Sequence, residues 1–111
     1  MTWNGLNRIH NVPGMGDDDE SLIAELQEVL VRHGAQHRIG ITLLHSHFDL
    51  KEDEVLIERV DADNKRLTIT AEKASDFEAD QLLPTMWRLD TPSRQALQYC
   101  WRPRNSPYHA I

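Results

Sequence analysis

Two histidines separated by one residue, His45 and His47, have the types and spacing best suited to chemistry in this chain. Because side chains alternate along a β-strand, both imidazoles would lie on one face, about 6–7 Å apart along the chain. Two imidazoles at that spacing can bind one divalent transition metal ion, such as zinc, nickel or iron. A third ligand could come from Glu52, Cys100 or His109. The pattern therefore indicates a candidate metal site.

A structural role is the alternative for the same two histidines. Ile39, Ile41 and Leu43 precede them on the same face of the expected strand. Histidine often occupies half-buried positions, where its ring nitrogens make hydrogen bonds. Acid–base chemistry without a metal is a third alternative. A motif this short does not choose among the three roles without its structural context.

The pair is similar to the His-x-His motif of cupins and of carbonic anhydrases, a resemblance that covers three residues. A cupin has a glycine before the pair, a glutamate after it, and a second glycine beyond that glutamate. Gly40 and Glu52 stand near the first two places, but the second glycine falls on Arg59. No glycine follows Gly40 in the sequence, whereas a jelly roll needs many tight turns. The cupin family is therefore not assigned.

The C-terminal third combines aromatic and guanidinium side chains, the types enriched at binding hot spots. The candidate binding surface consists of Tyr99, Trp101, Arg102, Arg104 and Tyr108. The alternative is that a C-terminal strand simply packs these aromatic side chains. Cys100 lies among them, and its type favours a buried structural thiol over a nucleophile, which would need a positioned base.

Charge is divided unevenly along the chain. The 18 Asp and Glu residues outnumber the 12 Lys and Arg residues, for a net charge of −6. This acidic balance argues against nucleic acid as the main partner. Residues 81–111 reverse the sign, since they hold Asp90 against four arginines. Surfaces of opposite sign favour a protein partner, including a second copy of the chain in a homodimer.

The single cysteine excludes an internal disulfide and is typical of a reducing compartment. No apolar run approaches the roughly 18 residues of a membrane span, and the first residues lack the basic start of a secretory signal. We therefore expect a soluble cytoplasmic chain without membrane association. We expect a small acidic binding or accessory protein. The alternative is a metal-binding protein or metal-dependent enzyme centred on the histidine pair.

The elements that must position these residues begin with a helix. Its apolar residues recur at helical spacing: Leu22, Ile23, Leu26, Val29 and Leu30. Asp17 and Glu20 have the spacing of a capping box, and Gly34 is a natural stop. The sequence therefore predicts a helix over 19–33, after an irregular lead-in over 1–16.

Five strands are predicted from their apolar, β-branched and aromatic content, over 38–48, 54–60, 66–72, 86–89 and 91–101. Residues 61–65 have the composition of a hairpin turn. Ser75 and Glu78 have capping spacing, which predicts a helical turn within 75–84. For the last strand, a helix that starts at Thr91 and Pro92 is the alternative.

These elements define the expected fold class. It is α+β, with one N-terminal helix packed on a four- or five-stranded antiparallel sheet. A chain of 111 residues has the length of one domain. We therefore expect a single domain over 1–111, ending in an extended tail over 103–111.

Overall fold

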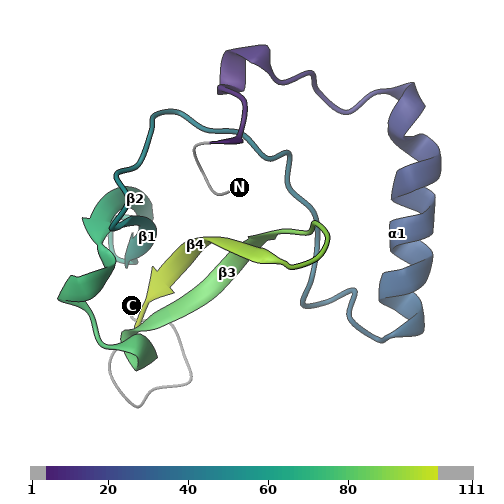
Figure 1. Ribbon diagram of the computed structural model, residues 1–111. Helices are drawn as coiled ribbons and strands as arrows, with labels where there is room; N and C mark the ends of the chain where they lie inside the picture. Colours follow the sequence, from purple (N-terminus) through teal and green to yellow (C-terminus); the bar gives the residue numbers. More distant parts are fainter. Residues whose placement is uncertain (1–4, 103–111) are drawn as a thin grey trace. The chain divides into compact units, whose positions relative to one another are not determined.

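The structure is a computed structural model that describes residues 5–102 of the chain. The predicted tail, with Arg104, Tyr108 and His109, lies outside the described residues. The chain forms two compact units (Figure 1). The helix unit is Asn7–His47, and the sheet unit holds the described residues 5–6 and 48–102. The α+β class is confirmed, because one unit carries an α-helix and the other a four-stranded sheet. The single domain stays a prediction.

Helix α1 spans Glu20–Arg32, within one residue of the predicted bounds at each end. It does not stand at the N-terminus, because two short 3-10 segments, Ile9–Asn11 and Asp17–Asp19, precede it. The Gly16 N–H donates to a carboxylate oxygen of Asp19 at 3.0 Å. The acidic run therefore stabilises the turn that leads into the helix. Within residues 5–102, no helix is long and apolar enough to cross a membrane.

Helix α1 ends in a Schellman motif at Gly34, the residue that the sequence indicated as the stop. Gly34 has a φ of 65°, in the left-handed region that glycine adopts without a steric penalty. The Ala35 N–H donates to the Leu30 carbonyl at 2.8 Å, and the Gly34 N–H donates to the Val31 carbonyl at 3.0 Å. These two bonds satisfy carbonyls that a helix end would otherwise leave unpaired. The prediction of Gly34 as the stop is confirmed.

The sheet unit contains four strands: β1 (Glu54–Asp61), β2 (Arg66–Lys73), β3 (Leu82–Arg88) and β4 (Gln95–Trp101). Their spatial order is β2-β1-β4-β3. The pairs β1–β2 and β3–β4 are antiparallel, whereas β1 and β4 are parallel. The prediction of an antiparallel sheet is therefore wrong, and the sheet is mixed. Alternation of apolar and polar residues identifies strands, but it does not specify the direction of a neighbour.

The segment over 38–48 is not a strand, so this prediction is wrong. Its one ladder contact within residues 5–102 is an isolated parallel bridge from Ser46 to Arg8. Ile39 and Ile41 are 49% and 57% exposed. The composition favours a strand, but a strand also needs a neighbour along its length to pair its backbone groups. Among the described residues, this segment has such a neighbour only at Ser46.

The remaining boundaries differ less from the predictions. β3 begins at Leu82 instead of residue 86, and 3-10 turns at Ala74–Asp76 and Ala79–Gln81 precede it. Its Pro84 is tolerated because β3 is an edge strand, where a missing N–H need not leave a neighbouring strand unpaired. The ambiguous segment over 91–101 forms a strand from Gln95 onward.

The core of the sheet unit lies on its central parallel pair. Leu56 and Ile57 of β1 are 2% and 0% exposed, and Leu97 of β4 is 4% exposed. Because consecutive residues of a strand point to opposite faces, both faces of β1 are covered at this point. Burial decreases toward β2, where Leu67 and Ile69 are 63% and 48% exposed.

Candidate functional site

The two histidines of the predicted metal motif face each other within the helix unit. Their ring centroids lie 5.0 Å apart in an edge-to-face arrangement. His45 is half-buried and His47 is exposed. The Nδ1 atom of His45 lies 2.7 Å from the Leu43 carbonyl oxygen. Since a carbonyl can only accept, Nδ1 carries the proton, and Nε2 of the neutral ring keeps its lone pair.

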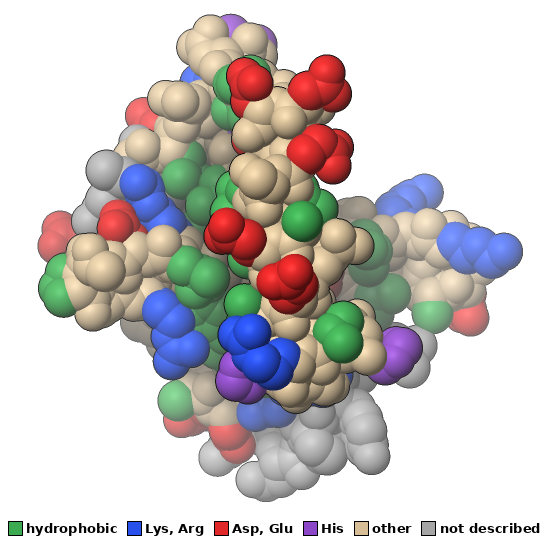
Figure 2. Space-filling model, turned by 90° about the vertical axis from the view of Figure 1, so that its right-hand side faces the viewer, with side chains coloured by type: hydrophobic (Ala, Val, Ile, Leu, Met, Phe, Trp, Pro, Cys, Tyr) green, Lys and Arg blue, Asp and Glu red, His purple; other side chains and the backbone are tan. Residues whose placement is uncertain are grey.

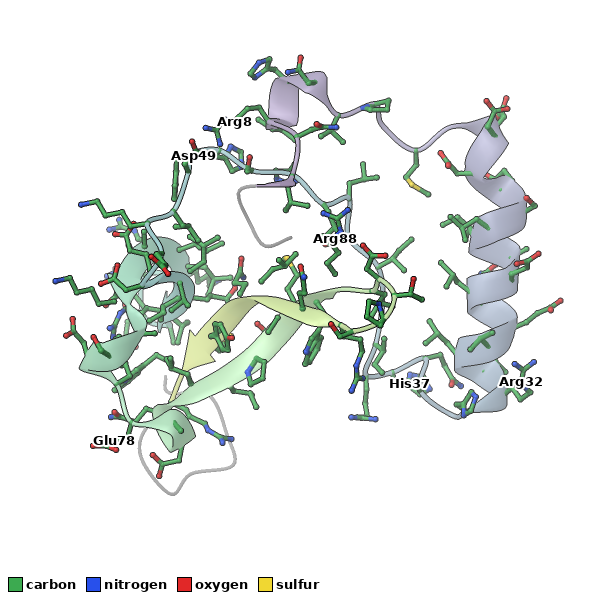
Figure 3. The ribbon with its side chains drawn as sticks, in the orientation of Figure 1. Arg8, Arg32, His37, Asp49, Glu78 and Arg88 are labelled. Carbon is green, nitrogen blue, oxygen red and sulfur yellow. The ribbon has the colours of Figure 1, made fainter. Side chains whose placement is uncertain are left out.

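Ser46, between the two histidines, fixes the motif in place. It is fully buried, and its Oγ accepts a hydrogen bond from the Arg8 guanidinium at 3.0 Å. Its N–H donates to the Asn7 carbonyl at 2.8 Å, and the Ile9 N–H donates to the Ser46 carbonyl at 3.0 Å. Figure 3 labels Arg8 in the segment that makes these contacts. Sequence reasoning missed this anchor, because it depends on the Arg8 side chain, which is 38 residues away in the sequence.

No third metal ligand accompanies the pair within residues 5–102, where no group of three or more His, Cys, Asp or Glu side chains could hold a metal ion. Glu52 and Cys100 belong to the sheet unit, whereas the pair belongs to the helix unit. Their role as third ligands therefore stays a prediction. The described pair itself brings two imidazole rings together.

Cys100 lies in the core of the sheet unit, where it is 3% exposed. It stands opposite Glu58 in the parallel pair, and its Sγ donates to a Glu58 carboxylate oxygen at 2.7 Å. The Thr85 hydroxyl lies 3.8 Å from the same sulfur. Burial, followed by the Glu58 carboxylate, raises the pKa of the Cys100 thiol to about 11. Since the thiolate is the reactive form, this cysteine is a hydrogen-bond donor and a poor nucleophile at neutral pH.

Arg59 organises the other face of the sheet. Its guanidinium donates to both carboxylate oxygens of Glu72, at 2.9 and 3.2 Å. It also lies over the rings of Phe77 and Trp101, at 5.7 and 5.4 Å from their centroids. The hydrogen bonds from Arg59 lower the pKa of the Glu72 carboxyl below its usual value. This cluster ties β1, β2 and β4 together by a charge-assisted pair and two cation–π contacts.

The described residues of the predicted aromatic and basic surface are engaged inside the sheet unit. Tyr99 and Trp101 are half-buried on β4. The Arg102 N–H donates to the Gln81 carbonyl at 2.9 Å, and Arg102 Nε donates to the Asp80 carbonyl at 2.9 Å. These contacts give Trp101 and Arg102 a structural role, and their role in binding stays a prediction.

Helix α1 is amphipathic and contains no fully buried residue. Leu22 and Val29 are 52% and 40% exposed, while Leu26 is half-buried. Figure 2 shows acidic side chains along the helix, with hydrophobic side chains beside them. Packing of this apolar face on the sheet stays a prediction.

The strand β2 presents the most regular exposed surface of the sheet unit. It pairs with β1 over all eight residues without a register shift. Within the described part of the chain, no strand pairs with its other edge. Leu67 and Ile69 stand on one face of β2 and are largely exposed. Sequence reasoning identified the strand and its alternation, but it did not identify β2 as an end strand, because strand order is a property of the whole sheet.

The chain matches no protein-family model, and no curated protein or solved structure matches it either. Its function is therefore inferred from the geometry of its own residues.

Proposed function

We propose that this chain is a small acidic binding or accessory protein that acts through a protein–protein surface on its sheet unit. The supporting observation is the exposure of Leu67 and Ile69, at 63% and 48%, on one face of the end strand β2. Single exposed apolar residues are common on protein surfaces. Leu67 and Ile69 are neighbours on one face of β2. The backbone N–H and C=O groups on the outer edge of this strand pair with no other described strand. Such an edge binds an extended segment of another chain through main-chain hydrogen bonds and side-chain contacts.

The charge of the chain supports the same proposal. The charges that matter for a partner are those at the contact itself, because they determine which strand can pair there. Exposed residues of β2 include Arg66 and Lys73 at the two ends of the strand. A strand with charged ends and an apolar centre discriminates among partners by charge while it gains affinity from apolar burial.

The proposal is tested with a double variant, Leu67→Thr with Ile69→Thr, which removes apolar surface but keeps residues that favour strands. The matched control is Leu89→Thr, because Leu89 is 75% exposed and lies outside β2. The immobilised parent chain should retain a partner from extracts of its source cells. We expect the double variant to retain about tenfold less of it, and the control to match the parent. Equal retention by all three chains, with unchanged circular dichroism, would contradict the proposal.

Metal binding is a second candidate function, favoured by the orientation of His45. Its Nδ1–H donates to the Leu43 carbonyl, so Nε2 is the atom left to bind a metal. Metal-binding histidines commonly hold their second nitrogen in this way, because the hydrogen bond fixes the tautomer and the ring orientation. His47 lies beside it at a centroid distance of 5.0 Å.

Thermal melts with and without Zn²⁺, Ni²⁺ or Fe²⁺ test this second candidate. A metal that binds the folded chain should raise its melting temperature, and less so in acid, because protons compete with the metal for the imidazole nitrogens. His45→Ala and His47→Ala should abolish the rise, while His37→Ala should keep it, since His37 lies outside the pair (Figure 3). If metals leave the parent unchanged and the pair variants lose about 1–3 kcal/mol of stability, the histidines are structural.

A further inference from the structure

The strand β2 has an arrangement of side chains that is complementary to itself. Its first seven residues read Arg-Leu-Thr-Ile-Thr-Ala-Glu, from Arg66 to Glu72. From these residues we infer that the partner of β2 is a second copy of the chain, paired antiparallel about a two-fold axis at Ile69. This inference rests on the proposed function, since it names the partner of the same surface.

The two edge strands of the sheet, β2 and β3, differ in their capacity to pair with another strand. β3 contains Pro84, which lacks an N–H, and its register with β4 shifts between Pro84 and Met86 and again between Met86 and Trp87. Proline and bulges are devices that protect an edge from pairing. β2 has neither, and its register with β1 is regular from Arg66 to Lys73. Because only one edge of the sheet formed by the described strands is suited to pairing, two copies form a closed dimer instead of a filament.

The two-fold axis determines which residues meet. An axis perpendicular to the sheet keeps each face of one copy beside the same face of the other copy. Opposed residues in an antiparallel pair share a face, so odd-numbered residues of β2 meet odd-numbered residues. With Ile69 opposite itself, the residues on either side pair in order outward from the axis.

The even-numbered residues of β2, from Arg66 to Glu72, form its polar face. On this face, the register brings opposite charges together twice. Arg66 of each copy stands opposite Glu72 of the other, and Thr68 stands opposite Thr70. Pairs of opposite charge and Thr–Thr pairs are both favourable cross-strand combinations. Glu72 already accepts two hydrogen bonds from Arg59 and one from the Thr70 hydroxyl, but a carboxylate has about four acceptor sites and can accept one more donor.

On the apolar face, Leu67 of each copy stands opposite Ala71 of the other, and the two Ile69 side chains meet at the axis. Leu67 and Ile69 are the most exposed apolar residues of β2. Pairing therefore removes from water the same side chains that the monomer leaves exposed, and hydrophobic burial stabilises the contact.

Other registers lose these contacts. A shift of two residues in one direction places Lys73 opposite Leu67, and a shift in the other direction places Arg66 opposite Thr70. Neither shifted register brings Arg66 to Glu72. In the favoured register Lys65 stands opposite Lys73, but Lys65 has a φ of 51° and lies in the turn before β2, where the chain has left the strand. Charge therefore selects one register.

The test measures the mass of the full chain by sedimentation over a range of concentrations. The parent should dimerise reversibly, with a dimer fraction that rises with concentration. Arg66→Glu and Glu72→Lys should each raise the dissociation constant about tenfold or more, since each replaces attraction by repulsion twice. An equimolar mixture of the two variants should form a heterodimer, because one Arg66–Glu72 pair is then unchanged and the other pair is attractive again with its signs exchanged.

Arg94→Glu is the matched control, because Arg94 is exposed, lies outside β2 and undergoes the same change of charge. It should dimerise like the parent. A monomeric parent, or folded variants that stay monomeric when mixed, would overturn the inference. So would a dimer that withstands Arg66→Glu. A monomeric parent that still retains a different protein through Leu67 and Ile69 would leave the proposed function standing. A monomeric parent that retains no protein would refute both the dimer and the proposed function.

Discussion

At the scale of single residues, Cys100 and Glu58 show how a polar pair is accommodated in the core of a small sheet. A carboxylate beside a buried thiol is tolerated because the thiol stays protonated and donates to it at 2.7 Å. The same contact disfavours nucleophilic chemistry at this lone cysteine. The pKa of about 11 leaves very little thiolate at neutral pH.

We predict that the Cys100 thiol of the folded chain reacts slowly with a disulfide reagent at pH 8. A pKa raised from 9.0 to about 11 lowers the thiolate fraction about a hundredfold relative to the unfolded chain. Glu58→Gln removes the negative charge and should increase the rate, whereas Glu52→Gln, at an exposed position, should not. The rate of thiol release by absorbance provides the measurement. Equal rates for the folded and the urea-unfolded chain would contradict the prediction.

The same pKa shift makes stability depend on alkaline pH. Between pH 9.0 and about 11, the unfolded chain loses the Cys100 proton while the folded chain retains it. The folded state therefore binds more protons in this window, and the free energy of unfolding should fall as pH rises. Urea unfolding at pH 8 and pH 10 should show the loss. Cys100→Ser, which does not titrate in this range, should show less of it.

At the scale of elements, the β1–β2 hairpin has one strained position. The loop is held by Asn64, whose side chain donates to the Asp61 carboxylate at 2.8 Å. The next residue, Lys65, has a φ of 51°, a conformation that costs residues with a Cβ about 1–2 kcal/mol. Lys65→Gly should therefore raise the free energy of unfolding by up to about 1 kcal/mol, after the extra flexibility of glycine in the unfolded chain is offset. Lys65→Ala keeps the Cβ and should give no gain in parallel urea titrations.

Elements with strong local signals were predictable from the sequence. Helix α1 and strands β1 and β2 lie within one residue of their predicted bounds, because periodicity and a glycine stop act locally. The segment over 38–48 shows the limit, since its composition favours a strand but no neighbour accompanies it along its length in the described part of the chain. The parallel pairing of β1 with β4 depends on contacts far apart in sequence.

The candidate sites also combine features that depend on neighbouring residues with features that depend on residues far apart in the sequence. The rings of His45 and His47 lie together, although the strand that was expected to place them on one face does not form. Their anchor at Ser46 depends on Arg8, which is 38 residues away in the sequence. The β2 edge follows from strand order, which no single segment specifies. Sequence therefore predicts what neighbouring residues can do together, and the fold determines which distant residues join them.

At the scale of the whole molecule, the two compact units raise the question of whether they unfold together. Helix α1 has 13 residues and no fully buried side chain. Isolated helices of about 12–15 residues are marginal in water. The helix therefore needs tertiary contacts to persist, and its half-buried apolar residues, including Leu26, are the ones that can provide them.

We predict one cooperative transition in which helix and sheet unfold together. Far-ultraviolet circular dichroism reports mainly on α1, while tryptophan fluorescence includes Trp87 and Trp101 of the sheet. The two signals should have the same midpoint in urea, as expected for a single small domain. Leu26→Ala should lower both midpoints together, at a cost of about 1–3 kcal/mol. Leu22→Ala is the matched control, because Leu22 is 52% exposed, and it should cost less than about 0.5 kcal/mol. Loss of the helical signal well before the fluorescence change would mean that α1 is stabilised independently of the sheet, and the prediction of a single domain would be wrong.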